Sequence, residues 1–183
     1  MIVLLVGKSA SGKDTYLHEF TKVGYKPIIS YTTRPIRDGE EDGVDYNFVS
    51  EEEFNSLIEE NKILEYRSYN TLYEGKPEIW YYGSPKINAQ QNYVGVVDVD
   101  GANTYIEKYG EENITVIYIY VSDEVRTERA KLRGSFDETE WNRRLADDNI
   151  KIERHLINTN NIICIDNEVE SIEDNMLKIL FVI

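Results

Sequence analysis

A phosphate-binding loop is indicated near the amino terminus, where an apolar run gives way to glycine, lysine and serine. Residues 2–6 read Ile-Val-Leu-Leu-Val, which is typical of a parallel strand buried on both faces. The pattern G-x-x-x-x-G-K follows as Gly7, Lys8, Ser9, Ala10, Ser11, Gly12 and Lys13. Glycines let several backbone N–H groups face one concavity at a helix start, and Lys13 supplies charge for the β and γ phosphates. These residues predict a nucleoside triphosphate site; a glycine-rich turn that binds nothing is the alternative.

The residue after the loop lysine departs from this pattern. A Ser or Thr hydroxyl normally ligates magnesium there, but the chain has Asp14, with Thr15 one residue later. A carboxylate is a suitable ligand for a hard cation, so we expect Asp14 to hold Mg²⁺ directly or through water, or Thr15 to compensate. Asp98, near the end of the expected strand 94–99, is placed like a second magnesium carboxylate beside the loop strand.

Composition limits the class of protein. The chain has 183 residues, 41% apolar and 30% charged, which suits one globular domain with a sizeable core. Its formal charge of -14 repels polyanions and anionic lipid, so nucleic acid and membrane surfaces are poor partners. Against this background arginines stand out in two groups, one at residues 34 and 37 and the other between residues 126 and 144.

Cysteine content and hydropathy indicate a cytoplasmic location. Cys164 cannot form an internal disulfide, because it is the one cysteine, and its apolar neighbours predict a core position. Met1 leads straight into the first strand, so no signal peptide is expected, and no apolar stretch approaches the ~18 residues of a membrane helix.

Strand and helix patterns alternate along the chain, which predicts an α/β fold with a parallel sheet and crossover helices. Residues 33–92 interrupt this order and read as an inserted lobe of short strands around a helix at 51–61, capped by Ser50 with Glu53 as its box partner. The other expected strands are 27–31, 94–99, 114–121 and 162–165. The other expected helices are 12–21, 102–109, 122–133 with Ser122 as its N-cap, one from about 137 that carries Trp141, Leu145 and Ile152, and 172–180.

Several further segments resemble the guanylate kinases. Residues 30–50 read S-Y-T-T-R-P-I-R-D-G-E-E-D-G-V-D-Y-N-F-V-S, similar to that family's nucleoside monophosphate segment. The match continues through Ile63-Leu64-Glu65-Tyr66, Tyr81-Tyr82-Gly83-Ser84 and Val97-Asp98-Val99-Asp100-Gly101-Ala102, in the family's order over nearly the whole chain. The resemblance implies ATP-dependent phosphorylation of GMP and dGMP with Mg²⁺, in a monomer or weak homodimer.

The same resemblance implies an architecture. It is a P-loop NTPase fold in which a parallel core sheet flanked by helices comprises residues 1–32 and 93–183. A small mixed α/β lobe that binds the nucleoside monophosphate would span about 33–92, and a helical lid about 129–145.

Substrate residues follow from the matched positions. A monophosphate dianion suits two guanidinium groups and tyrosine hydroxyls, and guanine offers N1–H and N2–H₂ to a single carboxylate. By resemblance the phosphate ligands are Arg34, Arg37, Tyr46 and Tyr82, the carboxylate is Glu65, the hydroxyls at the base are Ser30 and Ser84, and Asp98 also faces GMP. Each of these residues seen alone would more often be a surface ion pair or a capping group.

Phosphoryl transfer needs positioning and charge more than a nucleophile, so Lys13 and arginines are expected to carry it. Arg133-Gly134 and Arg143-Arg144-Leu145 are similar to the family's lid, which implies that Arg133 and Arg144 contact the transferring phosphates and that Arg133 stacks on adenine. Arg129 either joins them or pairs with acidic neighbours on its helix. His18 and His155 are interpreted as structural.

Two further departures from the family concern specificity. Residues 70–80 make the link between Glu65 and Tyr82 roughly eight residues longer than in the family, and they are rich in Tyr and Trp. The adenine-side Asn of the family reads Asp166, followed by Asn167. We therefore expect a reshaped base pocket and a loose preference for the phosphate donor.

Two other functions remain open at this point. One is a kinase of the same fold that acts on another phosphate ester or deoxynucleotide, which the retention of Ser30, Glu65 and Ser84 disfavours. The other is a noncatalytic guanylate-kinase-like module that binds protein, which the retention of Lys13, Arg133 and Arg144 disfavours.

Overall fold

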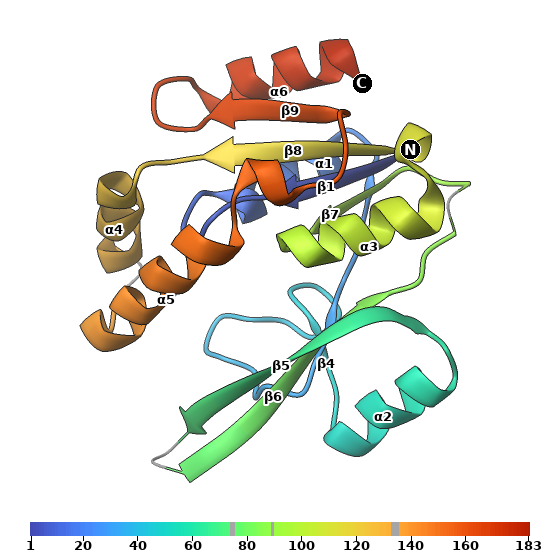
Figure 1. The fold of residues 1–183 in the computed structure, drawn as a ribbon, viewed down its shortest axis with the longest axis vertical. Coiled ribbons are helices and arrows are strands. Elements are labelled where there is room, and N and C mark those ends of the chain that lie inside the picture. The colour runs from blue at the N-terminus through green and yellow to red at the C-terminus, as the bar shows by residue number, and fades with distance from the viewer. Residues whose placement is uncertain (74–75, 89, 133–135) are drawn as a thin grey trace. The chain divides into compact units, whose positions relative to one another are not determined.

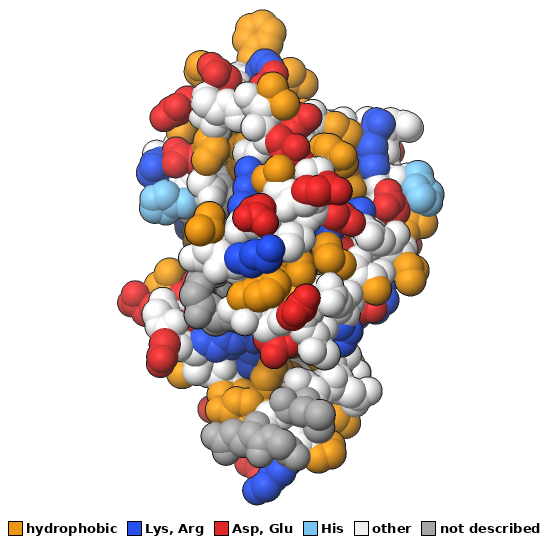
Figure 2. Space-filling model, turned by 90° about the vertical axis from the view of Figure 1, so that its left-hand side faces the viewer, with side chains coloured by type: hydrophobic (Ala, Val, Ile, Leu, Met, Phe, Trp, Pro, Cys, Tyr) orange, Lys and Arg blue, Asp and Glu red, His pale blue; other side chains and the backbone are white. Residues whose placement is uncertain are grey.

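The computed structural model describes residues 1–183 except 74–75, 89 and 133–135 and the side chain of Leu72. The chain forms two compact units, residues 1–27 with 89–183, called the core unit, and residues 28–88, called the hairpin unit. No helix in the described ranges is long and apolar enough to cross a membrane. Figure 2 shows acidic and basic side chains interspersed on one face, so the net charge of -14 does not make this face uniformly acidic.

The core unit is an α/β layer structure around a parallel sheet with strand order β2-β7-β1-β8-β9 (Figure 1). Its strands are β1 Ile2–Val6, β2 Lys26–Pro27, β7 Tyr93–Val96, β8 Ile114–Tyr120 and β9 Ile162–Asp166. Its helices are α1 Lys13–Lys22, α3 Val99–Tyr109, α4 Asp123–Leu132, α5 Glu138–Lys151 and α6 Ile172–Val182, with 3-10 turns η1 Glu111–Asn113 and η2 Arg154–Leu156. The predicted parallel core is confirmed.

Alternate side chains of the central strand β1 pack on opposite faces of the sheet. Both faces are buried, which explains why the sequence of the strand is apolar throughout. Val3 and Leu5 belong to a fully buried cluster with Tyr16 and Phe20 of α1 and Ile179 of α6. The opposite side of the sheet is covered by α3, which contacts β1 and β8 and lies in front of the sheet in Figure 1, with α1 behind it. Burial on both faces fixes the strand that carries the phosphate loop.

Cys164 is exposed, so the prediction of a core position is wrong. It lies in β9, the edge strand of the sheet, between Ile163 and Ile165, whose side chains join the main apolar cluster. Side chains alternate between the faces of a strand, so Cys164 points to the other face, which is open at this edge.

Asp98 caps a helix and does not end a strand. The strand β7 stops at Val96, and the Asp98 carboxylate accepts a hydrogen bond from the Gly101 N–H at 2.7 Å as the N-cap of α3. The expected strand 94–99 was therefore too long and the expected start of the helix at 102 too late. An aspartate N-cap satisfies an N–H group that the first turn leaves unpaired, which favours the earlier start.

The hairpin unit is built on a mixed sheet with strand order β4-β3-β6-β5. Its strands are β3 Tyr31–Thr32, β4 Asn47–Phe48, β5 Ile63–Tyr73 and β6 Lys76–Pro85, and its helix is α2 Glu51–Glu59. The predicted capping box is confirmed, because Ser50 Oγ accepts from the Glu53 N–H at 3.2 Å and the Glu53 carboxylate accepts from the Ser50 N–H at 2.8 Å. Phe54 of α2 is fully buried against the sheet.

Two strand predictions for this region are wrong. The expected strand 27–31 is two short strands in different sheets, because the chain leaves the core unit after Pro27 and pairs again only at Tyr31. The expected short strands of the lobe include a long antiparallel pair, in which β5 has 11 residues and β6 has 10. Residues 70–73 and 76–80 of the insertion continue these two strands, in register from Asn70 opposite Ile79 to Tyr73 opposite Lys76.

Candidate active site

The phosphate loop occupies residues 7–12 between the end of β1 and the start of α1 at Lys13. Gly12 has φ 95° and Ala10 has φ 60°, so the loop turns through left-handed conformations immediately before the helix. A Cβ on Gly7 would lie 2.7 Å from both the Ile119 carbonyl oxygen and Ser11 Oγ, so only glycine fits there. The loop therefore has the backbone that the sequence motif predicts, at the helix N-terminus where an anion is favoured.

Lys13 folds back over this loop. Its Nζ donates to the carbonyl oxygens of Gly7 at 2.8 Å and Lys8 at 3.0 Å. The ammonium group is thereby held at the loop, within the first turn of α1. Asp14 and Thr15, the next two residues, are exposed.

A buried ion pair from two other helices holds the loop at Ser9. The Asp148 carboxylate on α5 accepts from the Ser9 N–H at 2.7 Å and from Arg126 on α4 at 2.8 Å. Arg126, which is fully buried, also donates to the Ser9 carbonyl at 2.9 Å and to Asp123 at 2.7 Å. The Arg126 and Asp148 side chains therefore bond both polar backbone groups of one loop residue. Sequence reasoning noticed Arg126 only as part of a basic cluster and missed Asp148.

A second support reaches the loop at Ser11 from the end of β9. The buried Asn167 side chain donates to the Ser11 carbonyl at 2.8 Å and accepts from Tyr16 on α1 at 3.0 Å. Arg129 donates to the Asn167 carbonyl at 2.6 Å and to the Ser11 carbonyl at 3.5 Å. Arg129 thus bonds backbone carbonyls of the loop and of Asn167, whereas one of the two predicted alternatives for it was pairing with acidic neighbours on its helix. Asn167 faces the loop, whereas Asp166 is exposed.

The lid arginines are described only in part, because Arg133 and Gly134 lie outside the described residues. Arg143 and Arg144 of α5 both donate to the Glu140 carboxylate, Arg144 through Nε at 2.9 Å. The hydrogen bonds from Arg143, followed by those from Arg144, lower the pKa of Glu140 to about 2 even though partial burial opposes this shift. Arg144, an expected phosphate ligand, is thus paired with a carboxylate.

In the hairpin unit, two expected base-binding residues are brought together on neighbouring strands. Glu65 of β5 lies opposite Ser84 of β6, and the Ser84 hydroxyl donates to the Glu65 carboxylate at 2.7 Å. Ser84 is buried, and Ser30 is half-buried directly before β3, whose Tyr31 pairs with Gly83. The carboxylate has a fixed place on a two-stranded platform.

Three of the expected phosphate ligands also lie together in this unit. The Arg34 guanidinium is 5.6 Å from the centre of the Tyr46 ring, and the Tyr46 and Tyr82 rings are 6.0 Å apart. Arg34 is buried and pairs with both oxygens of Glu40, at 3.0 and 2.8 Å. Arg37 is exposed, and its backbone N–H donates to the same carboxylate at 2.8 Å. Burial raises the pKa of Glu40, but the hydrogen bonds from Arg34 and Arg37 outweigh it and hold that pKa below its usual value.

The family model for guanylate kinases matches residues 1–181. The chain belongs to the guanylate kinase family. A guanylate kinase of Onion yellows phytoplasma (strain OY-M) is 30% identical to it over 190 residues, which cover 98% of this chain and 84% of that protein. A guanylate kinase of Malacoplasma penetrans (strain HF-2) is 28% identical, over 98% of this chain and 92% of that protein. The crystal structure of guanylate kinase from Anaplasma phagocytophilum is similar with a TM-score of 0.60 and 25% identity, over 100% of this chain and 83% of that one.

The donor set of this guanylate kinase family member fits a magnesium ion held mostly by water and phosphate. Asp14 follows the loop lysine, and Asp98 follows β7, the parallel neighbour of β1, so both carboxylates lie at the carboxyl edge of the sheet. Asp14 is exposed, and one Asp98 oxygen is used by the Gly101 N–H. Within the described ranges no group of three acidic, histidine or cysteine side chains forms a metal cluster. Mg²⁺ often binds proteins through one or two carboxylates in this way.

Sequence reasoning named Asn167 only as the neighbour of Asp166, and it missed the role of Glu40. Glu40 could have been found from the sequence, because Gly39-Glu40 is part of the segment that matches the family. Asn167 had only its place beside Asp166, and nothing in the sequence shows which of two neighbouring side chains turns inward.

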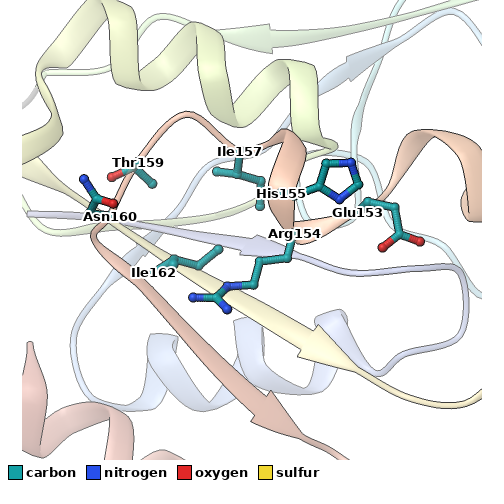
Figure 3. A pocket seen from close by; sticks show the side chains of 7 residues that line it. All are labelled: Glu153, Arg154, His155, Ile157, Thr159, Asn160 and Ile162. Atoms are coloured by element: carbon teal, nitrogen blue, oxygen red, sulfur yellow. The ribbon is translucent and has the colours of Figure 1, made fainter.

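A hollow of about 450 Å³ lies between η2 and β9, and one of its lining residues, Glu153, pairs with Lys8 Nζ of the phosphate loop at 3.4 Å. Figure 3 shows Thr159 and Asn160 at one end of it and Glu153 and His155 at the other. Their polar groups do not converge on one point, and Thr159 donates to Glu111 at 2.6 Å. We therefore assign this hollow no role in the site.

Proposed function

We propose that the protein transfers the γ-phosphoryl group of ATP to GMP and to dGMP, giving ADP and the guanine nucleoside diphosphate. The observation that carries this proposal is the hydrogen-bonded pair of Glu65 and Ser84 on adjacent strands. Membership of the guanylate kinase family supports the same reaction.

Guanine recognition in this proposal depends on the charge of Glu65. A carboxylate accepts from both N1–H and N2–H₂ of guanine, whereas the corresponding edge of adenine offers an acceptor at N1. A buried acceptor left unpaired costs about 1–3 kcal/mol, so a site built around Glu65 rejects AMP. Ser84 fixes the rotamer of this carboxylate, and Ser30 adds a hydroxyl at the base.

The monophosphate is held by the charged and phenolic groups around Arg34. The guanidinium of Arg34 is oriented by Glu40, which fixes its plane before substrate arrives. Arg37, Tyr46 and Tyr82 complete the set of donors. Their role is to hold the attacking phosphate oxygen in position, because phosphoryl transfer is accelerated mainly by alignment and charge neutralisation.

ATP is bound by residues 7–15 of the core unit. Backbone N–H groups of the loop and the ammonium of Lys13 receive the β and γ phosphates, and Lys13 exchanges its carbonyl partners for phosphate oxygens. Arg144 and Arg133 stabilise the charge on the transferring group, and Arg133 stacks on adenine. Asp14 and Asp98 would hold Mg²⁺ directly or through water, and the ion would supply charge neutralisation for the phosphates.

The two units and the lid have separate tasks in this proposal. Residues 28–88 form the acceptor lobe, residues 129–145 form the lid, and the rest forms the core that holds ATP. Closure of lobe and lid around both nucleotides excludes water and so suppresses hydrolysis of ATP.

The test is a coupled assay of ADP release with MgATP and GMP, dGMP, AMP, CMP or dTMP offered separately. Turnover restricted to the two guanine nucleotides is expected. If a different monophosphate is the preferred acceptor, or if none is phosphorylated while ATP still binds by isothermal titration, the proposal is wrong.

A further inference from the structure

Arg67 lies on the same face of the hairpin as the residues proposed to bind GMP. Side chains of a strand alternate between its faces, so Glu65, Arg67 and Tyr69 of β5 share one face. The register places Arg67 directly opposite Tyr82, and Glu65 directly opposite Ser84. Arg67 is therefore the next same-face residue after the proposed base carboxylate along β5, and it lies directly beside the proposed phosphate tyrosine of β6, on a single platform.

The contacts of Arg67 place its guanidinium at the base end of this platform. Its Nη1 is 3.4 Å from the Glu65 carboxylate, and its side chain is 40% exposed. The same nitrogen donates to the Tyr66 carbonyl at 3.3 Å. The Tyr69 ring, on the other side of Arg67 along the strand, is 6.4 Å from the Tyr82 ring, so the face is continuous from Glu65 to Tyr69.

Guanine presents its polar atoms in an order that matches this face. The N2–H₂ and N1–H donors lie side by side, followed by the O6 and N7 acceptors around the ring. In a nucleotide with its base anti, the O6 and N7 edge lies between the N1 edge and the 5′-phosphate. An arginine fork is the side chain that most often pairs with O6 and N7 together.

We propose that Arg67 is a specificity residue that reads O6 and N7 of the guanine whose N1 and N2 are read by Glu65. The inference rests on the proposed function of the hairpin unit as the GMP site. Adenine has an amino donor in place of O6, which faces the donors of the guanidinium and is repelled. Glu65 and Arg67 thus accept from and donate to adjacent parts of one base, and each rejects adenine for its own reason.

The experiment measures kcat/KM for GMP, for 7-deaza-GMP, in which N7 is a C–H group, and for IMP, which lacks the N2 amine. With the wild type, loss of the N7 acceptor leaves one charged donor unpaired, so 7-deaza-GMP is expected to be about 10-fold poorer than GMP. With Arg67→Met, kcat/KM for GMP falls roughly 5- to 150-fold, the range for losing a bidentate pair. GMP and 7-deaza-GMP should then be equal within about 2-fold, because the N7 partner is gone.

Two comparisons separate this role from others. IMP should keep its disadvantage relative to GMP in Arg67→Met, because Glu65 still reads N2. Lys76→Met removes an exposed cation on the same face farther along the hairpin, opposite Tyr73, and should change neither ratio.

The ratio of GMP to 7-deaza-GMP decides the proposal. If Arg67→Met lowers kcat/KM for both nucleotides equally, Arg67 only balances the charge of Glu65 and the proposal is wrong. It is also wrong if the wild type shows no preference between the two, although GMP turnover would then leave the proposed function standing. If the wild type does not phosphorylate GMP at all, the proposed function itself fails, and this inference fails with it.

Discussion

Replacing Asp148 by alanine removes the carboxylate through which α5 bonds the phosphate loop. Asp148 is buried and accepts from the Ser9 N–H and from Arg126, which is fully buried. Removing one partner of a buried ion pair costs about 3–5 kcal/mol because the other charge remains in the interior. Asp123 still pairs with Arg126 at 2.7 Å, so we expect the low end, about 3 kcal/mol.

Urea denaturation followed by circular dichroism measures this loss. With an m value of about 2 kcal/mol/M, the midpoint of Asp148→Ala should fall by about 1.5 M relative to the wild type. The matched control is Asp147→Ala, one residue earlier on α5, whose partners Arg143 and Lys151 are exposed. Exposed ion pairs contribute about 0–1 kcal/mol, so the midpoint of the control should fall by less than about 0.5 M.

A double variant separates loss of stability from loss of loop geometry. Arg126→Met with Asp148→Leu replaces the pair by apolar side chains, which is often neutral or stabilising for a buried pair, so stability should return toward that of the wild type. The Ser9 N–H and carbonyl remain without these partners, so affinity for a nonhydrolysable ATP analogue should stay reduced. Equal urea midpoints for Asp148→Ala and Asp147→Ala would refute the reasoning, as would full recovery of ATP-analogue affinity in the double variant.

Three other changes test separate parts of the structure. Gly7→Ala forces a Cβ to within 2.7 Å of the Ile119 carbonyl oxygen, so it should lower the free energy of unfolding by about 1–3 kcal/mol and weaken ATP binding. Thermal unfolding measures the first effect and titration with ATP the second. Unchanged values of both would contradict the packing described. Ser50→Ala removes one half of the capping box and should cost about 1 kcal/mol in urea denaturation, whereas Ser56→Ala, whose hydroxyl bonds within α2, should cost less. Glu140 has its pKa lowered from 4.5 to about 2, so its bonds to Arg143 and Arg144 stabilise the fold fully above pH 4.5 and are lost as the pH falls toward 2. The side chain is 44% exposed, so the difference in free energy of unfolding from Glu140→Gln should be at most about 1 kcal/mol; a difference that stays constant down to pH 2 would contradict the assignment.

Local sequence signals predicted the parts of the fold that depend on local chemistry. The apolar run predicted the strand β1. The two glycines and the lysine after them predicted the loop and the start of α1, all within the first fifteen residues. The Ser50 capping box was equally local and was confirmed in detail. These features depend on neighbours in the chain, so the sequence carries them directly.

The misplaced features depend on partners far apart in the chain. Cys164 looked buried because its neighbours are apolar, but the order of strands makes β9 an edge. The strand expected at 27–31 divides because its two ends pair in different sheets. Arg126 and Asp148 are 22 residues apart on different helices, and no spacing rule connects them. For the proposed site, types and order of residues indicated Glu65 and Ser84, but only the register of β5 and β6 places Arg67 opposite Tyr82.

The measurement that tests the central claim most directly compares GMP and AMP as acceptors for the wild type and Glu65→Ala in the ADP-release assay with MgATP. The account predicts efficient turnover of GMP by the wild type and negligible turnover of AMP. In Glu65→Ala, kcat/KM for GMP should fall by at least about 100-fold with ATP affinity unchanged, since the reader of N1 and N2 is lost. Equal turnover of GMP by the two proteins would show that Glu65 does not read the base and would contradict the account.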